Sequence, residues 1–123
     1  MTDSTRPADR FAGDAASLDL DREAADLLER AAGSEHGHAQ RTLYRHGGLT
    51  VAMFAFRAHA GLPAHAAGGV VSVQVLRGRV TMHAGDERFD LPAGRMLRMT
   101  PGTRHDVTAE VASVILLHVA LSA

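Results

Sequence analysis

The feature that most constrains the fold of this chain is a series of short β-rich segments after Gly33, each separated from the next by a turn signal. Residues 41–45 and 49–57 flank His46-Gly47-Gly48, and six further segments follow between residues 70 and 121. Glycine- and proline-containing turns separate them, and no helical period intervenes. With 123 residues, the chain has room for one domain. Eight to ten closely spaced strands predict an antiparallel sandwich or barrel.

The alternation of side chains along the middle strands identifies the face that packs inward. Successive residues of a strand point to opposite sides, so an apolar residue at every second position marks the buried face. The residues predicted to face inward are Val71, Val73, Val75, Val80, Met82, Leu97 and Met99. Their neighbours, among them Gln74, Leu76 and His83, are predicted to face outward.

The segment before the strands differs in character. Residues 1–17 are polar and aperiodic, and we expect a flexible tail without the hydrophobic core of a signal peptide. Residues 18–33 predict a helix with an apolar stripe, capped by Asp19 or Asp21 and ended by Gly33. The stripe consists of Leu20, Ala24, Leu27, Leu28 and Ala31. The sequence leaves two alternatives for the surface that packs against this stripe: the strands of its own domain, predicted over residues 41–121, or a second subunit.

Composition excludes several classes of protein. The chain has no cysteine, which excludes disulfides, thiolate zinc sites and iron–sulfur clusters. Its 13 basic and 14 acidic residues are balanced, so we expect no nucleic-acid partner. No apolar run is long enough to span a membrane, so we expect a cytoplasmic protein without a membrane partner. There is no glycine-rich phosphate loop, and we expect no nucleotide or flavin cofactor.

Two stretches of the strand region resemble the two sequence motifs of the cupins, a family of small jelly-roll β-barrels. In HAGLPAHAAGGVVSVQVLRG (59–78), His65 takes the first histidine position and Gly78 the closing glycine. In GRMLRMTPGTRH (94–105), Gly94, Gly102 and His105 fall in place. The resemblance implies an all-β, RmlC-like jelly-roll barrel with one N-terminal α-helix, and it makes a homodimer the expected state. The helix and the face that carries Gln74 and Leu76 would bury against the second copy.

The departures from these motifs bear on function. Ala67 stands where the family has its second histidine, and Val71 stands where it has glutamate. Of the four metal ligands that the resemblance implies, this chain therefore retains two, His65 and His105. Stable binding of a divalent transition metal requires three or more nitrogen or oxygen donors from the protein. Zinc, nickel, iron or manganese would therefore bind weakly or not at all. We expect His59 near the barrel mouth and His118 in an apolar strand as weak candidates for a third ligand.

Two functional hypotheses follow. In the first, the chain binds a small molecule in the barrel through His65 and His105, without a strong metal site. Its pocket would be lined by Val71, Val73, Val75, Met82, Leu97 and Met99. Arg104 at the rim would bind a carboxylate or phosphate group. In the second, the chain is a metal-dependent cupin enzyme of dioxygenase, isomerase or hydrolase type with a non-standard third ligand. The sequence leaves open whether the protein is an enzyme.

Overall fold

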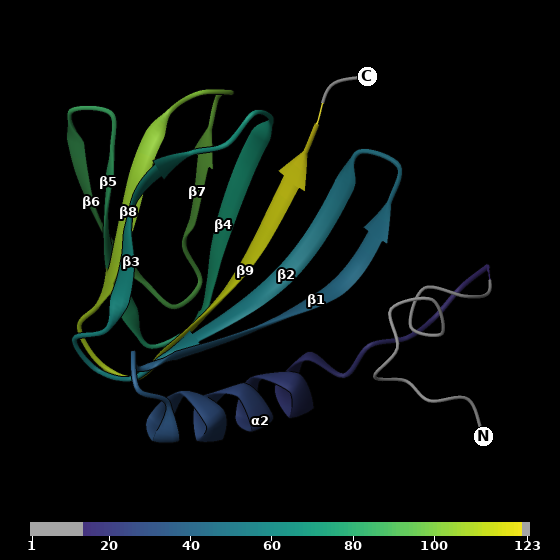
Figure 1. Ribbon diagram of the computed structural model, residues 1–123, viewed down its shortest axis with the longest axis vertical. Coiled ribbons are helices and arrows are strands. Elements are labelled where there is room, and N and C mark those ends of the chain that lie inside the picture. The colour runs from purple at the N-terminus through teal and green to yellow at the C-terminus, as the bar shows by residue number, and fades with distance from the viewer. Residues whose placement is uncertain (1–13, 122–123) are drawn as a thin grey trace.

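The structure is a computed structural model that describes residues 14–121, so most of the tail predicted over residues 1–17 lies outside it. Two antiparallel sheets form the molecule (Figure 1). The five-stranded sheet A has the order β1-β2-β9-β4-β7, and the four-stranded sheet B has the order β3-β8-β5-β6. This is the predicted all-β jelly roll with one helix, and the fold prediction is confirmed.

The strands follow the turn signals in the sequence. In chain order they are β1 (His38–His46), β2 (Leu49–Phe56), β3 (Gly61–Ala66), β4 (Val70–Arg77), β5 (Arg79–Ala84), β6 (Glu87–Pro92), β7 (Met96–Met99), β8 (Arg104–Ala109) and β9 (Ser113–Ala120). The first strand starts at residue 38, three residues before the predicted boundary. Residues 67–69 and 100–103 connect β3 to β4 and β7 to β8, and Figure 1 shows both connections at one end of the barrel, its upper end.

The interior between the sheets is apolar, as the alternation predicted. All seven residues expected to face inward are buried, from Val80 at 0% exposure to Leu97 at 8%. They form one cluster that also contains Phe56 of β2 and Val107 of β8. Burial of such side chains, at about 25 cal/mol per Å² of apolar surface, is the main stabilising contribution to the barrel.

The helix α2 (Leu20–Gly33) packs on the outer face of sheet A in its own chain. The Asp19 side chain accepts a hydrogen bond from the main-chain N–H of Arg22 and so caps the first turn. Leu27, the largest side chain that the helix buries, enters a cluster with Leu43 and Met53. Figure 1 shows α2 across the lower end of the sheet. Within the described residues, no helix has the length and apolar character needed to cross a membrane.

Candidate functional site

His65 and His105 meet at the upper end of the barrel. They are direct partners across β3 and β8, with ring centroids 4.4 Å apart and ring planes at 58°. His105 lies two residues from Val107, whose side chain belongs to the interior cluster, so both share the inner face of β8. A register shift between Leu62 and His65 brings His65 onto that same face. The structure therefore brings together the two histidines that the motifs identify.

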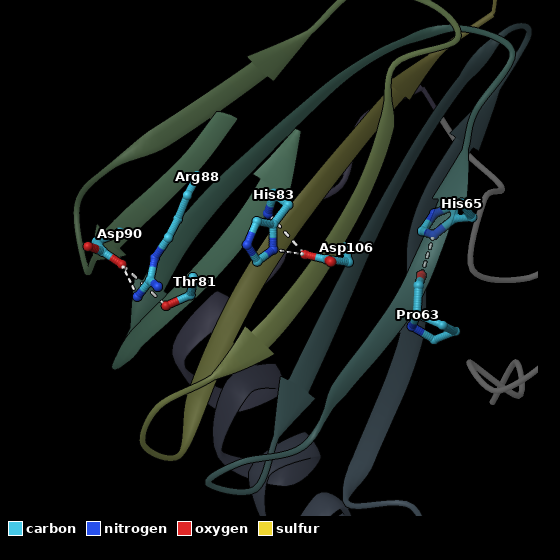
Figure 2. A network of polar contacts seen from close by, with 7 residues as sticks. All are labelled: Pro63, His65, Thr81, His83, Arg88, Asp90 and Asp106. Atoms are coloured by element: carbon cyan, nitrogen blue, oxygen red, sulfur yellow. Dashed lines mark hydrogen bonds and ion pairs between the residues drawn. The ribbon is translucent and has the colours of Figure 1, made fainter. Parts of the chain in front are cut away.

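The main chain fixes the proton position on both rings. The Nδ1 atom of His65 lies 3.1 Å from the carbonyl oxygen of Pro63, a contact drawn in Figure 2, and the Nδ1 atom of His105 lies 2.9 Å from the carbonyl oxygen of Thr103. A carbonyl oxygen only accepts, so Nδ1 must carry the proton in each ring. In the neutral rings Nε2 then holds a lone pair. Among residues 14–121, no group hydrogen-bonds to either Nε2 atom.

The two histidines differ in access. His105 is buried, at 6% exposure, while His65 is exposed on the edge strand of sheet B. The pair thus has one ring set into the barrel wall and one at the rim. A molecule approaching from solvent would meet His65 first and His105 behind it.

The neighbours of the pair at the upper end are mostly apolar. In sheet B the cross-strand partner of His105 on its other side is Ala84, which packs against the interior cluster. In sheet A the upper inner row contains Met99 and Val71, which are direct partners. Val71 is the residue at the family's glutamate position, and it is buried at 2% exposure. The wall beside the two histidines therefore contributes methyl and methylene groups in place of a carboxylate.

The remaining predicted lining residues lie deeper in the barrel. Val73 pairs with Leu97 one row below Val71, and Val75 lies a further row down. Met82 pairs with Val107 on sheet B, one row below His105. These side chains are buried against one another and support the upper rows.

The structure does not bring His59 to the pair, and the expectation that it lies near the mouth is wrong. Its main-chain N–H donates to the carbonyl oxygen of Ala109 at 2.7 Å. Ala109 is four residues along β8 from His105, which corresponds to about 13 Å at the rise of a strand. His59 therefore sits at the lower end of the barrel, in a turn where it has a φ of 72°.

His118 is also placed away from the pair. Its neighbours Leu117 and Val119 pack against the interior cluster, so the alternation along β9 puts His118 on the outer face of sheet A. Its cross-strand partners are Val51 and Ser72. The structure therefore does not place His118, a weak candidate for a third ligand, beside the pair. The apolar sequence of β9 did not reveal this, because Val114 and Leu116 on its outer face pack in the cluster beneath α2.

Arg104 begins β8 at the upper end, next to His105. The alternation places it on the outer face of sheet B, and it is exposed. Its main-chain carbonyl accepts the N–H of Gly85 at 2.9 Å, which ties the β5–β6 turn to the rim. The structure therefore shows a main-chain contact for Arg104, and its predicted anion-binding role stays a prediction.

One carboxylate that the sequence analysis missed shares the inner face at this end. Glu87 of β6 pairs with Ala84, and Phe89 and Leu91, which follow it at every second position, pack in the interior. The same alternation in the sequence could have identified it. Glu87 is exposed and lies two strands from His105, about 10 Å away at the usual strand spacing.

A second histidine interaction lies on the outer face of sheet B (Figure 2). The Nδ1–H of His83 donates to Asp106 Oδ1 at 3.0 Å, and the main-chain N–H of His83 donates to the same oxygen at 2.9 Å. Burial raises the pKa of the Asp106 carboxyl, but these hydrogen bonds and the attraction to His83 and His105 outweigh it and lower the pKa. This pair is separate from the barrel site.

The donor set at the barrel site does not fit a metal ion held by this chain alone. Two imidazoles are present, and no group of three or more His, Cys, Asp or Glu close enough to hold a metal occurs within residues 14–121. Catalytic and structural metal sites use three or four protein donors. Glu87, the carboxylate on the inner face at this end, lies two strands from His105 and is too far away to serve as a third donor.

A family model for AraC-like ligand-binding domains matches residues 46–114, which is more than half of the chain. The chain belongs to this family of cupin-type domains, and the resemblance to small cupins is confirmed. The matched region runs from the end of β1 into β9 and includes both histidines of the pair. Comparison with curated protein sequences gives no match.

Solved structures support the same fold. A conserved protein of unknown function from Streptococcus pyogenes matches with a TM-score of 0.72 and 22% identity, covering 91% of this chain and 92% of that one. An RmlC-like cupin from Shewanella frigidimarina matches with a TM-score of 0.67 and 16% identity, covering 71% and 78%. Salicylate 1,2-dioxygenase from Pseudoaminobacter salicylatoxidans matches with a TM-score of 0.68 and 17% identity, covering 82% of this chain and 31% of that one. At these identities the likeness concerns the fold.

Proposed function

We propose that this chain binds a small organic molecule at the upper end of its barrel, with His65 and His105 as the polar contacts. The observation that carries the proposal is the geometry of the pair. Two imidazoles lie 4.4 Å apart, and each is oriented by a hydrogen bond from Nδ1 to a main-chain carbonyl, which leaves Nε2 for a ligand. The family to which the chain belongs is described as ligand-binding.

The pair suits a ligand that both accepts and donates hydrogen bonds. A neutral ring accepts through Nε2, while a protonated ring donates from it. A small organic acid or a sugar offers the matching groups, and Val71 and Met99 offer apolar contact for its carbon skeleton.

A metal-dependent cupin enzyme is the second candidate, favoured by the same pair of Nε2 atoms. Salicylate 1,2-dioxygenase, which shares the fold, shows that such barrels include enzymes. The third donor would have to come from the bound molecule or from a group beyond residues 14–121. Because the described donors do not complete a site, we derive no reaction from it.

One set of measurements tests both candidates. Tag-free protein would be analysed for bound metal and, in the presence of a chelator, screened against small organic acids and sugars by thermal shift. We expect a stabilising ligand for the wild type that has no effect on His65→Ala or His105→Ala. His83→Ala is the matched control, because His83 is exposed on the other face of sheet B and should leave binding unchanged.

Two outcomes would contradict the proposal. Ligands that stabilise the two alanine variants as well as the wild type would place binding elsewhere. About one metal per chain, lost in His65→Ala, would favour the metal-dependent enzyme.

A further inference from the structure

One row of cross-strand neighbours on the inner face of sheet B joins the histidine pair to a carboxylate. His65 pairs with His105, and His105 pairs with Ala84 on its other side. Ala84 pairs in turn with Glu87, so the row crosses all four strands of the sheet. Figure 1 shows the β5–β6 turn, which Ala84 and Glu87 flank, at the upper end of the barrel. We call these four residues the mouth row.

The Glu87 side chain is available to a ligand. Phe89 and Leu91 follow it at every second position and pack in the interior, so Glu87 projects from the inner face. It is exposed, and within residues 14–121 its carboxylate has no ion pair or hydrogen bond. On the outer face, by contrast, Asp90 and Asp106 each contact a basic side chain. Glu87 is therefore a carboxylate without a partner in the described chain.

Apart from its histidines, the inner face of sheet B has one charged side chain among the described residues, and its charge is negative. Alternation along β5, β6 and β8 places Arg79, Arg88 and Arg104 on the outer face, opposite to Glu87. In sheet A, Arg45 faces inward on the edge strand β1, which lies three strands from β4. The mouth row therefore attracts a cation and repels an anion.

The spacing along the mouth row sets the size of a ligand that contacts both ends. Glu87 and His105 lie two strands apart, about 10 Å at the usual strand spacing. A hydrogen bond of about 2.9 Å at each end leaves roughly 4 Å between the two polar atoms of the ligand. A six-membered sugar ring separates an amine from the hydroxyls across the ring by about this distance. Between the two ends, Ala84 contributes only a methyl group, on which such a ring can lie.

We propose that the ligand of the barrel site is a hydroxylated primary amine, with an amino sugar as the representative case. Its ammonium group binds the Glu87 carboxylate, and its hydroxyl groups donate to the Nε2 lone pairs of His65 and His105. This inference rests on the function proposed above, which supplies the two imidazole contacts. It adds Glu87 as the residue that selects a ligand by its charge.

The test compares three sugars of similar shape: glucosamine, glucose and N-acetylglucosamine, in which the amine is an uncharged amide. Binding to the tag-free full chain would be measured by titration calorimetry at low salt with a chelator present. We expect the wild type to bind glucosamine about tenfold more tightly than the other two, as a hydrogen bond between charged groups allows. Raising the salt concentration should reduce this preference, because salt screens an exposed ion pair.

Two variants of one chemical type locate the preference. Glu87→Gln keeps the size of the side chain and removes its charge, so it should bind the three sugars with similar affinity. Glu110→Gln is the matched control, because Glu110 is exposed and follows β8 at the lower end of the barrel. It removes the same charge from the chain and should retain the preference for glucosamine. Far-UV circular dichroism would verify that both variants fold.

The outcomes separate this inference from the function on which it rests. Equal binding of the three sugars by the wild type, or a preference for glucosamine that survives in Glu87→Gln, would overturn the role of Glu87. If His65→Ala abolished that binding, the histidine pair would still stand as the ligand site. Sugar binding that His65→Ala leaves unchanged would refute both proposals. Absence of binding for all three sugars would overturn the inferred ligand class, and the wider screen would still decide the proposed function.

Discussion

Replacing Gly78 with alanine should destabilise the protein strongly. Gly78 alone joins β4 to β5 and has a φ of +81°, a conformation that costs an L-residue about 1–2 kcal/mol. A Cβ atom there would lie 2.3 Å from Ser113 Oγ and 2.4 Å from the carbonyl oxygen of Ala112. Ser113 is fully buried and cannot move freely, because its hydroxyl accepts the N–H of Arg79. Overpacking adds about 1–3 kcal/mol, so we expect a total loss of about 2–5 kcal/mol.

The measurement is the free energy of unfolding in urea, followed by far-UV circular dichroism because the chain has no tryptophan. Gly85→Ala is the matched control. Gly85 has a φ of +59°, but no atom lies within 4 Å of a Cβ built there, so only the conformational cost of about 1–2 kcal/mol applies. The difference between the two variants isolates the steric clash. If Gly78→Ala were no less stable than Gly85→Ala, the assignment of this glycine to close packing against β9 would be refuted.

Three further substitutions have defined expectations. Leu27→Ala should lower the free energy of unfolding by about 2–5 kcal/mol in the same urea experiment, because Leu27 is buried between α2 and sheet A. His59→Gly should raise it by about 0.5 kcal/mol, since glycine adopts the φ of 72° without strain, and a loss would contradict this. Asp106 has a lowered pKa in the folded state, so its stabilisation is present above the unfolded carboxyl pKa and lost as the pH falls through the folded value. The stability difference between wild type and Asp106→Asn should therefore shrink from pH 5 to about pH 3, and a constant difference would argue against ionic stabilisation.

The fold was predictable because local signals agreed with one another. The valines at every second position of β4 identify its inner face, and the structure buries all three. Turn residues separated the strands, and Asp19 and Gly33 marked the ends of the helix. Such agreement between pattern, turn chemistry and capping is what allows a sequence to specify a fold.

The candidate site was only partly predictable. The motif spacing identified His65 and His105, and the structure pairs them. His59 was misplaced because six residues along an extended chain can lead from one end of a barrel to the other. His118 was ambiguous because β9 is covered on its outer face by α2 as well as buried on its inner face, and hydrophobicity cannot distinguish the faces of such a strand.

The alternation along β8 has a consequence for any experiment on the site. His105 faces inward to His65, whereas Asp106, the next residue, faces outward to His83. The two pairs are nevertheless linked, because attraction to His105 contributes to the lowered pKa of the Asp106 carboxyl. Asp106→Asn therefore removes a charge that acts on both pairs, whereas His83→Ala changes the outer pair alone. Ligand binding that is lost in Asp106→Asn but kept in His83→Ala would point to the inner pair.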